Sequence, residues 1–264
     1  MQNSDISEAK QYIIDRVEAE TSFHNNLYDL IDSYASSLTD LAYGSNIQPN
    51  SFSFSNADIK DSVDKIIERL EDELIDYIDT LAVARHTEDK DDILAFIHDT
   101  YKGDTIEDVI HDHADHWKHE IEAVIAAAML TSVSKDRLLS MLKTYRTNTW
   151  RNPILANARN MAHSNTNVKW LYSNPDNSVG NSNSGVYMID AYGQFMVAMG
   201  WTKYFYDDAI KNGAIAFKVV RGSSYPCSTC DYECSYIHYS FDTLPPYHRS
   251  CRCITIPIFD ISEI

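Results

Sequence analysis

The chain has no cysteine in its first 226 residues, and all five of its cysteines then fall between residues 227 and 253. The common nucleotide, hydrolase and kinase motifs GxxxxGK(S/T), GxGxxG, GxSxG and HRD do not occur. No stretch approaches the ~18 apolar residues of a membrane span, and the opening residues lack the basic and apolar regions of a signal peptide. Nucleotide chemistry and serine hydrolysis therefore have no support, and we expect neither a standard secretory signal nor a membrane partner.

Positive charge is scarce in the first 150 residues. They hold 13 of the 22 basic residues but 30 of the 39 acidic ones, so they carry the whole net charge of −17. Residues 151–264 hold nine of each sign and are neutral. Because an acidic surface repels phosphate backbones, unaided DNA binding is disfavoured, and docking on a basic partner surface is favoured.

The first 150 residues have the apolar periodicity of helices. Two long helices, over residues 5–43 and 59–81, are separated by a polar loop and are expected to pair as an antiparallel hairpin. A short helix over Ile93–Tyr101, a long one opened by Thr105 and running to Leu130, and another that begins at Ser134 complete this part. We treat residues 1–150 as an acidic helical region for docking and assembly.

Residues 151–264 have a different pattern. The expected elements are a helix over 152–163, an Asn/Ser-rich loop over 164–185, a helix from Val186 to Met199 ended by Gly200, and strands at Ala214–Val220 and Cys253–Phe259. Pro257 places the last strand at a sheet edge. The predicted fold class is α+β, mainly α: long N-terminal helices, then a small α+β domain with a two- or three-stranded antiparallel sheet and a Cys/His-rich loop.

The cysteine cluster is the strongest functional signal. A CxxC turn such as Cys227–Cys230 presents two thiolates to one metal ion, and zinc wants four such ligands. The other two would come from His248, Cys251 and Cys253, since a spacing of two on an extended segment points both cysteines to one side. A structural zinc ion is the first interpretation; a buried cluster of reduced thiols, or disulfides in an oxidised particle, is the alternative. Cys234 and His238 are expected to be packing residues.

Two further interpretations have less support. The zinc deaminase pattern fails because no His-x-Glu or Cys-x-Glu precedes Cys227, and a Cys227–His248 nucleophile pair is not singled out among five cysteines. The His/Asp-rich run at residues 111–120 could bind a metal through Asp112, His116 and His119 or Glu120. Its helix must bury its apolar residues, however, so these polar side chains are expected to face solvent, and we assign the run no role.

The C-terminal part of the chain, residues 151–264 with the Cys/His cluster, resembles the head morphogenesis domain of tailed-phage minor head proteins, the phage Mu F-like family. That family ends with a strand, a CxxC turn, a variable hairpin, a Pro-rich approach to HPNCRC and an apolar strand. The corresponding residues here are Ala214–Val220, Cys227, Cys230, Pro245, Pro246, His248, Cys251, Arg252, Cys253 and Ile254–Pro257. Tyr247 and Arg249–Ser250 depart from the family pattern, and residues 164–185 resemble an insertion.

The resemblance implies a minor capsid protein and not an enzyme. Such a protein is a virion component located inside the head near the portal vertex, and in the host cytoplasm during assembly. It acts in head morphogenesis, in DNA packaging or in ejection, as an oligomer with portal protein or capsid subunits and with indirect contact to DNA. The competing hypothesis is a phage- or secretion-delivered effector or toxin with Cys- or zinc-centred hydrolase or nuclease activity.

Overall fold

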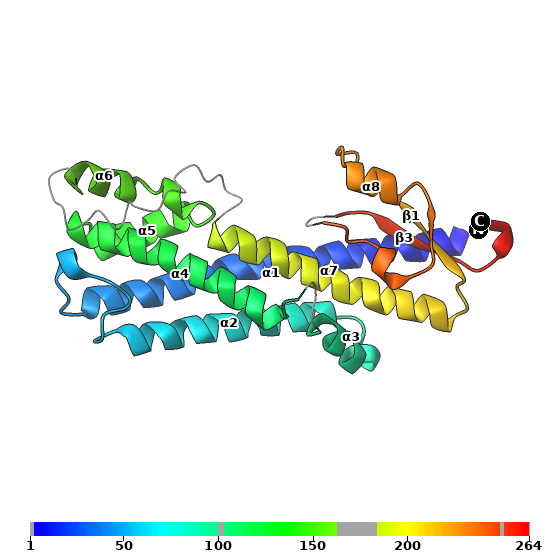
Figure 1. The fold of residues 1–264 in the computed structure, drawn as a ribbon, viewed down its shortest axis with the longest axis horizontal. Coiled ribbons are helices and arrows are strands. Elements are labelled where there is room, and N and C mark those ends of the chain that lie inside the picture. The colour runs from blue at the N-terminus through cyan, green and yellow to red at the C-terminus, as the bar shows by residue number, and fades with distance from the viewer. Residues whose placement is uncertain (1–2, 100–102, 163–183, 249–250, 264) are drawn as a thin grey trace. The chain divides into compact units, whose positions relative to one another are not determined.

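The fold is mainly helical, with one small sheet (Figure 1). The computed structural model describes residues 3–99, 103–162, 184–248 and 251–263. The predicted α+β, mainly α class is confirmed, including the long N-terminal helices and the small antiparallel sheet. The helices are α1 (Asn3–Gly44), α2 (Lys60–Ala82), α3 (Lys90–Ile97), α4 (Ile106–Leu130), α5 (Lys135–Thr144), α6 (Pro153–Ala162), α7 (Gly185–Lys211) and α8 (Ser228–Glu233), and the strands are β1 (Ala216–Val220), β2 (Ile237–His238) and β3 (Ile254–Ile258).

The chain forms two compact units. Unit 1 comprises Met1–Asn25, Asp76–Ile106 and Ala191–Ile264, and unit 2 comprises Asn26–Ile75 and Glu107–Asp190. Each unit combines segments from both sides of residue 150, so the units do not coincide with residues 1–150 and 151–264. The helices α1, α2 and α7 each have residues in both units. The roles that the sequence suggests for residues 1–150 and 151–264 stay predictions.

Unit 2 is a helical core in which two buried acids fasten loops. Glu122 on α4 accepts hydrogen bonds from the Phe54 amide (2.9 Å) and the Ser53 hydroxyl (2.7 Å), which hold the loop between α1 and α2. Burial alone would raise the pKa of Glu122, but hydrogen bonds from His119, Ser53 and Phe54 hold it below its usual range. Glu120 is fully buried and accepts from the Gly185 amide at the start of α7 (3.0 Å).

The His/Asp-rich run lies on α4. Its exposed histidines contact carboxylates: His111 lies 3.1 Å from Glu71 on α2, and His119 lies 3.2 Å from Asp115 on α4 itself. The expectation of a solvated face is confirmed for His111, Asp112, His116 and His119. Glu120 departs from that pattern, because its carboxylate is buried where it caps the start of α7.

In unit 1, α7 is longer than expected. The prediction that Gly200 ends this helix is wrong: α7 continues to Lys211, and Gly200 lies inside it. A Cβ on Gly200 would lie 2.7 Å from the Ala82 Cβ, so this glycine permits close packing of α7 on α2. The helix instead ends before Gly213, whose φ of 90° is one that glycine adopts at a helix end, and the Ala214 amide donates to the Ala209 carbonyl (2.9 Å).

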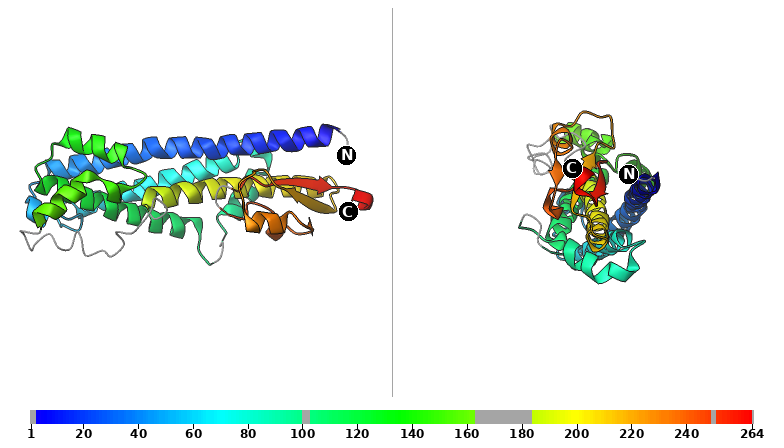
Figure 2. Two further views of the ribbon diagram at one scale, coloured as in Figure 1. Left: turned by 90° about the horizontal axis from the view of Figure 1, so that it is seen from above. Right: turned by 90° about the vertical axis from the view of Figure 1, so that its right-hand side faces the viewer.

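The sheet of unit 1 has the strand order β2-β1-β3, and both pairings are antiparallel. The strands at Ala214–Val220 and Cys253–Phe259 are confirmed to within two residues, and Pro257 lies on an edge strand as expected. The sheet has three strands, within the predicted two or three; the position of the short β2 is not predicted from the sequence, and it pairs His238 with Phe217. Figure 2 shows the start of α1 and the sheet at the same end of unit 1.

The predicted Asn/Ser-rich loop over 164–185 lies outside the described residues, apart from Ser184 and Gly185. Among the described residues, none of the helices combines the length and the apolar character needed to cross a membrane.

Candidate metal centre

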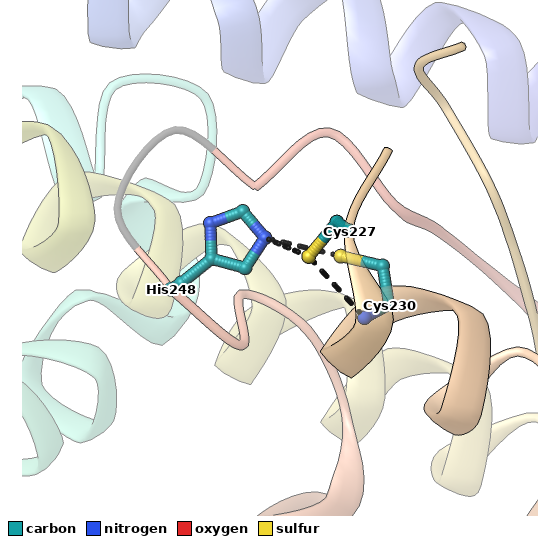
Figure 3. Close-up of side chains that lie close together, drawn as sticks. All are labelled: Cys227, Cys230 and His248. Carbon is teal, nitrogen blue, oxygen red and sulfur yellow. Dashed lines mark hydrogen bonds between the residues drawn. The ribbon is translucent and has the colours of Figure 1, made fainter. Parts of the chain in front are cut away.

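The CxxC turn opens the short helix α8. Cys227 is the N-cap residue, with extended backbone, and its Sγ accepts a hydrogen bond from the Cys230 amide (3.5 Å). Capping by a sulfur turns the chain so that both sulfurs of the CxxC point the same way (Figure 3). One half of the centre is thus built by local sequence alone.

His248 meets this turn from the segment before β3. Its Nε2 lies 3.2 Å from the Cys227 Sγ and 3.1 Å from the Cys230 Sγ, so one ring nitrogen faces both sulfurs (Figure 3). The imidazole is exposed, Cys227 is half-buried and Cys230 is buried. The three donor atoms lie within 4.8 Å of one another.

Cys251 and Cys253, in the segment just before β3, complete the cluster. Both side chains are buried, and their sulfurs together with the Cys230 Sγ also lie within 4.8 Å of one another. The Cys230 and Cys251 sulfurs are 3.9 Å apart. All five residues predicted from the sequence therefore converge, with Cys230 shared by two triads, and the cluster could hold a metal.

Three of the distances are close to those around a tetrahedral ion, and because the two triads share only Cys230, a fourth ligand must move inward to complete one site. With zinc–sulfur bonds of about 2.3 Å, two cysteine ligands of one zinc ion lie about 3.8 Å apart, and a sulfur and an imidazole nitrogen about 3.5 Å apart. The Cys230–Cys251 separation of 3.9 Å matches the first value. The two His248 distances, 3.1 and 3.2 Å, are shorter than the second, so the ring needs to move outward by a few tenths of an ångström.

The thiols differ in how readily they ionise. The Cys230 amide, followed by His248, lowers the pKa of Cys227, whereas burial raises the pKa of Cys230 to about 12. A hydrogen bond with Cys253 lowers the pKa of Cys251, and the same bond, with burial, raises the pKa of Cys253. The cluster thus contains two sulfurs, one in each half, whose pKa values are lowered below that of an ordinary thiol.

Cys234 and His238 lie at the edge of the cluster. His238 is buried on β2, where its Nε2 donates to the Glu233 carbonyl (2.8 Å), so that nitrogen is occupied. Cys234 is half-buried and packs against the cluster core, and burial raises its pKa. All five cysteines are free thiols.

The cluster is one side of a small apolar core. Phe217 and Val219 on β1 face it, and α7 contributes Ala209 from its last turns. Besides the cysteines, the described residues between β1 and β3 bury Leu244, Pro245, Pro246 and His238. Few aliphatic side chains hold the hairpin between β1 and β3, so sulfur, or a metal bound by sulfur, fills the place of a normal core.

Sequence reasoning missed three residues that position the centre. Arg221 donates to the Cys227 carbonyl (3.4 Å), and Arg16 of α1 donates to the Cys251 carbonyl (3.2 Å). Gly222, in the chain after β1, lies against the Cys251–Cys253 segment. A Cβ at this position would lie 1.6 Å from the Arg252 carbonyl oxygen, so only glycine permits this approach. A glycine directly after a predicted strand is a signal for such close approach, whereas nothing local links Arg16 to a residue 235 positions away.

We compared the chain with protein-family models, curated proteins and solved structures, and none of them matches.

Proposed function

We propose that the chain is a minor head protein of a tailed phage that acts in head morphogenesis at the portal vertex. The proposal rests on one observation: the ordered pattern of strand, CxxC, His, Cys-Arg-Cys and strand closes in space around one cluster. If the pattern has one function in this family, its separate motifs, the CxxC turn and the His and Cys-Arg-Cys segment, must meet at a single site. The convergence of Cys227, Cys230, His248, Cys251 and Cys253 meets this requirement.

The charge distribution supports a docking role. The net charge of −17 comes from residues 1–150, which contribute long helices and expose many carboxylates. Such a surface suits basic faces of portal or capsid subunits and does not suit direct DNA contact. The isolated chain should therefore give no shift of duplex DNA at physiological salt, and a salt-sensitive micromolar shift would contradict this part of the proposal.

The metal in this proposal is a structural zinc ion. A zinc site made only of cysteine and histidine, with four protein ligands and no open position, holds structure together and does not activate water. Cys227, Cys230 and His248 supply three ligands, and one of the buried pair Cys251 and Cys253 supplies the fourth. The ion would link the α8 turn to the segment before β3, in a hairpin that has little apolar core.

One observation favours the alternative of an effector enzyme. The His248 Nε2 lies 3.2 Å from the Cys227 Sγ, as in a nucleophile–base pair. That nitrogen is, however, equally close to the Cys230 Sγ, which a ligand set explains and a dyad does not. The neighbouring carboxylates are engaged as well, Asp231 with Arg221 and Glu233 with the Tyr236 hydroxyl. Head morphogenesis remains the function that the site supports best.

Purified phage particles provide the test. Particles banded by density should contain this chain at a few copies per head, measured by quantitative mass spectrometry against the major capsid protein. A deletion of the reading frame should leave particles that are incomplete or fail to deliver DNA. Absence of the chain from particles, together with normal heads in the deletion strain, would contradict the proposal and favour a secreted effector.

A further inference from the structure

A buried ion cluster contacts the metal centre at the Cys251 carbonyl. Arg16 and Glu20, one turn apart on α1, are 1% and 2% exposed, and the Arg16 Nε lies 3.2 Å from a Glu20 oxygen. Arg252, the residue between the two ligand candidates Cys251 and Cys253, forms an ion pair with the other Glu20 oxygen. Arg16 also donates through Nη2 to the Cys251 carbonyl. Two guanidiniums thus share one carboxylate beside the sulfurs.

This arrangement leaves positive charge uncompensated. A buried charge is destabilising unless an opposite charge or a full set of hydrogen bonds offsets the loss of water. Glu20 can balance only one of the two arginines. Arg252 is 30% exposed and keeps some water, but Arg16 is almost completely enclosed. A further negative charge near Arg16 would remove the imbalance.

The proposed zinc centre supplies that charge. Zinc with three thiolates and one neutral imidazole carries one net negative charge, and the cluster of Arg16, Arg252 and Glu20 carries one net positive charge. On the CxxC side, Arg221 also donates to the backbone carbonyl of a ligand residue, Cys227, but its charge is balanced by Asp231. Groups that hydrogen-bond to the ligand residues orient metal ligands and raise metal affinity.

We propose that Arg16 and Arg252 are positioning residues of the zinc centre that couple metal binding to the packing of α1, with Cys251 as the fourth ligand. The inference rests on the proposed zinc ion. Arg16 holds the Cys251 backbone, which distinguishes Cys251 from Cys253, and the Cys251 sulfur lies 3.9 Å from the Cys230 sulfur. Because coupling between two events is reciprocal, zinc should stabilise the packing of α1 residues 11–23, and this packing should strengthen zinc binding.

A purely structural role for the ion cluster makes a different prediction. If Arg16 only attaches the hairpin to α1, its replacement lowers the free energy of unfolding but leaves the zinc affinity of the folded protein unchanged. Zinc affinity and the cobalt(II) absorption spectrum therefore separate the two roles. The sulfur-to-cobalt charge-transfer band reports the number and arrangement of thiolate ligands, and it does not depend on stability as long as the protein is folded.

The test uses the full chain and the variants Arg16→Met, Arg16→Lys and Arg85→Met. Arg85 is the matched control, because it pairs with Asp15 on the same stretch of α1 but is 53% exposed. Competition with a chromophoric chelator should give zinc binding about 10–100-fold weaker for Arg16→Met, an intermediate loss for Arg16→Lys, and a change within about twofold for Arg85→Met. Cys253→Ser should retain the cobalt spectrum, and Cys251→Ser should alter it.

Hydrogen exchange of the wild-type chain provides a measurement that needs no variant to fold. Removal of zinc should speed exchange in α1 residues 11–23. Zinc binding by Arg16→Met equal to that of the wild type, or α1 exchange unchanged by zinc removal, would overturn the inference while leaving the zinc centre intact. A wild-type chain that binds no zinc would overturn the centre itself, and this inference with it.

Discussion

The two units fix their loops with groups of opposite charge. In unit 2, the buried carboxylates of Glu120 and Glu122 accept hydrogen bonds from backbone amides. In unit 1, the guanidiniums of Arg16 and Arg221 donate to backbone carbonyls of the cysteine segments. The carboxylates of unit 2 accept hydrogen bonds from amides and need no metal. The guanidiniums of unit 1 lie in the region of the cysteines, where their positive charge complements thiolates.

The units also differ in what fills their cores. Unit 2 buries aliphatic and aromatic side chains along whole helices, among them Leu38, Leu70 and Trp117. The segment between β1 and β3 in unit 1 places three buried cysteines, Cys230, Cys251 and Cys253, in one core cluster with Phe217, Val219 and Leu244. We expect unit 2 to be indifferent to metal and reducing agents, and the hairpin of unit 1 to depend on both.

The largest expected effect comes from the double variant Cys227→Ser and Cys230→Ser. It removes half of the ligands, so stoichiometric zinc binding should disappear. With free zinc a thousandfold above the dissociation constant, the wild-type chain should gain about 4 kcal/mol that the variant lacks. Hydrogen exchange should become faster over residues 216–258 and stay unchanged over residues 107–130. Unchanged melting and exchange in the variant would show that the cluster holds nothing together.

The second prediction concerns Glu120 in unit 2. Glu120→Ala leaves the Gly185 amide without its buried acceptor and should cost about 3 kcal/mol of unfolding free energy. Glu120→Gln keeps an acceptor oxygen and should cost about half as much. Urea unfolding measures both, and zinc affinity should not change in either variant. If the two variants cost the same, the hydrogen bond to Gly185 is not what Glu120 contributes.

These contrasts also show what the sequence could predict. Helical periodicity placed α4 at Ile106–Leu130, and β-rich runs placed β1 and β3, because each signal is local. The cysteine cluster could be predicted because cysteines concentrated in one segment must share surroundings. The role of Gly200 could not be predicted, since a glycine can end a helix or admit a neighbouring helix, and only the packing against Ala82 decides between them. Arg16 and Glu20 looked like ordinary polar residues of α1, and their burial depends on a segment far away in the chain.

Gly222→Ala should have a smaller effect, confined to unit 1. The added Cβ would lie 1.6 Å from the Arg252 carbonyl oxygen, so the segment before β3 must move away from the CxxC turn. We expect a loss of about 1–3 kcal/mol, with zinc binding weakened along with it. Gly44→Ala is the control, because no atom lies within 4 Å of a Cβ there. Wild-type zinc affinity in Gly222→Ala would mean that the two halves of the centre need not approach each other closely.

The smallest effect is a pH dependence that belongs to His86 in unit 1. His86 stacks on Tyr204 with ring centroids 3.4 Å apart, and burial lowers its pKa to about 4. The unfolded chain binds this proton near pH 6.5, whereas the folded chain binds it only near pH 4. The contribution of His86 to the free energy of unfolding is therefore complete above pH 6.5 and is lost as the pH falls towards 4. The loss should be about 2 kcal/mol after allowance for partial exposure. In His86→Phe, urea unfolding between pH 6.5 and 4 should depend less on pH; a slope equal to that of the wild type would contradict the assignment.

The most direct test of the central claim is the metal content of the wild-type chain. The protein is purified under reducing conditions without chelators and analysed by native mass spectrometry and elemental analysis. We expect one zinc ion per chain, lost together with the ligands in the double variant Cys227→Ser and Cys230→Ser. A chain that is fully folded, with its cysteines reduced, and that contains no zinc even after zinc is supplied would contradict this expectation.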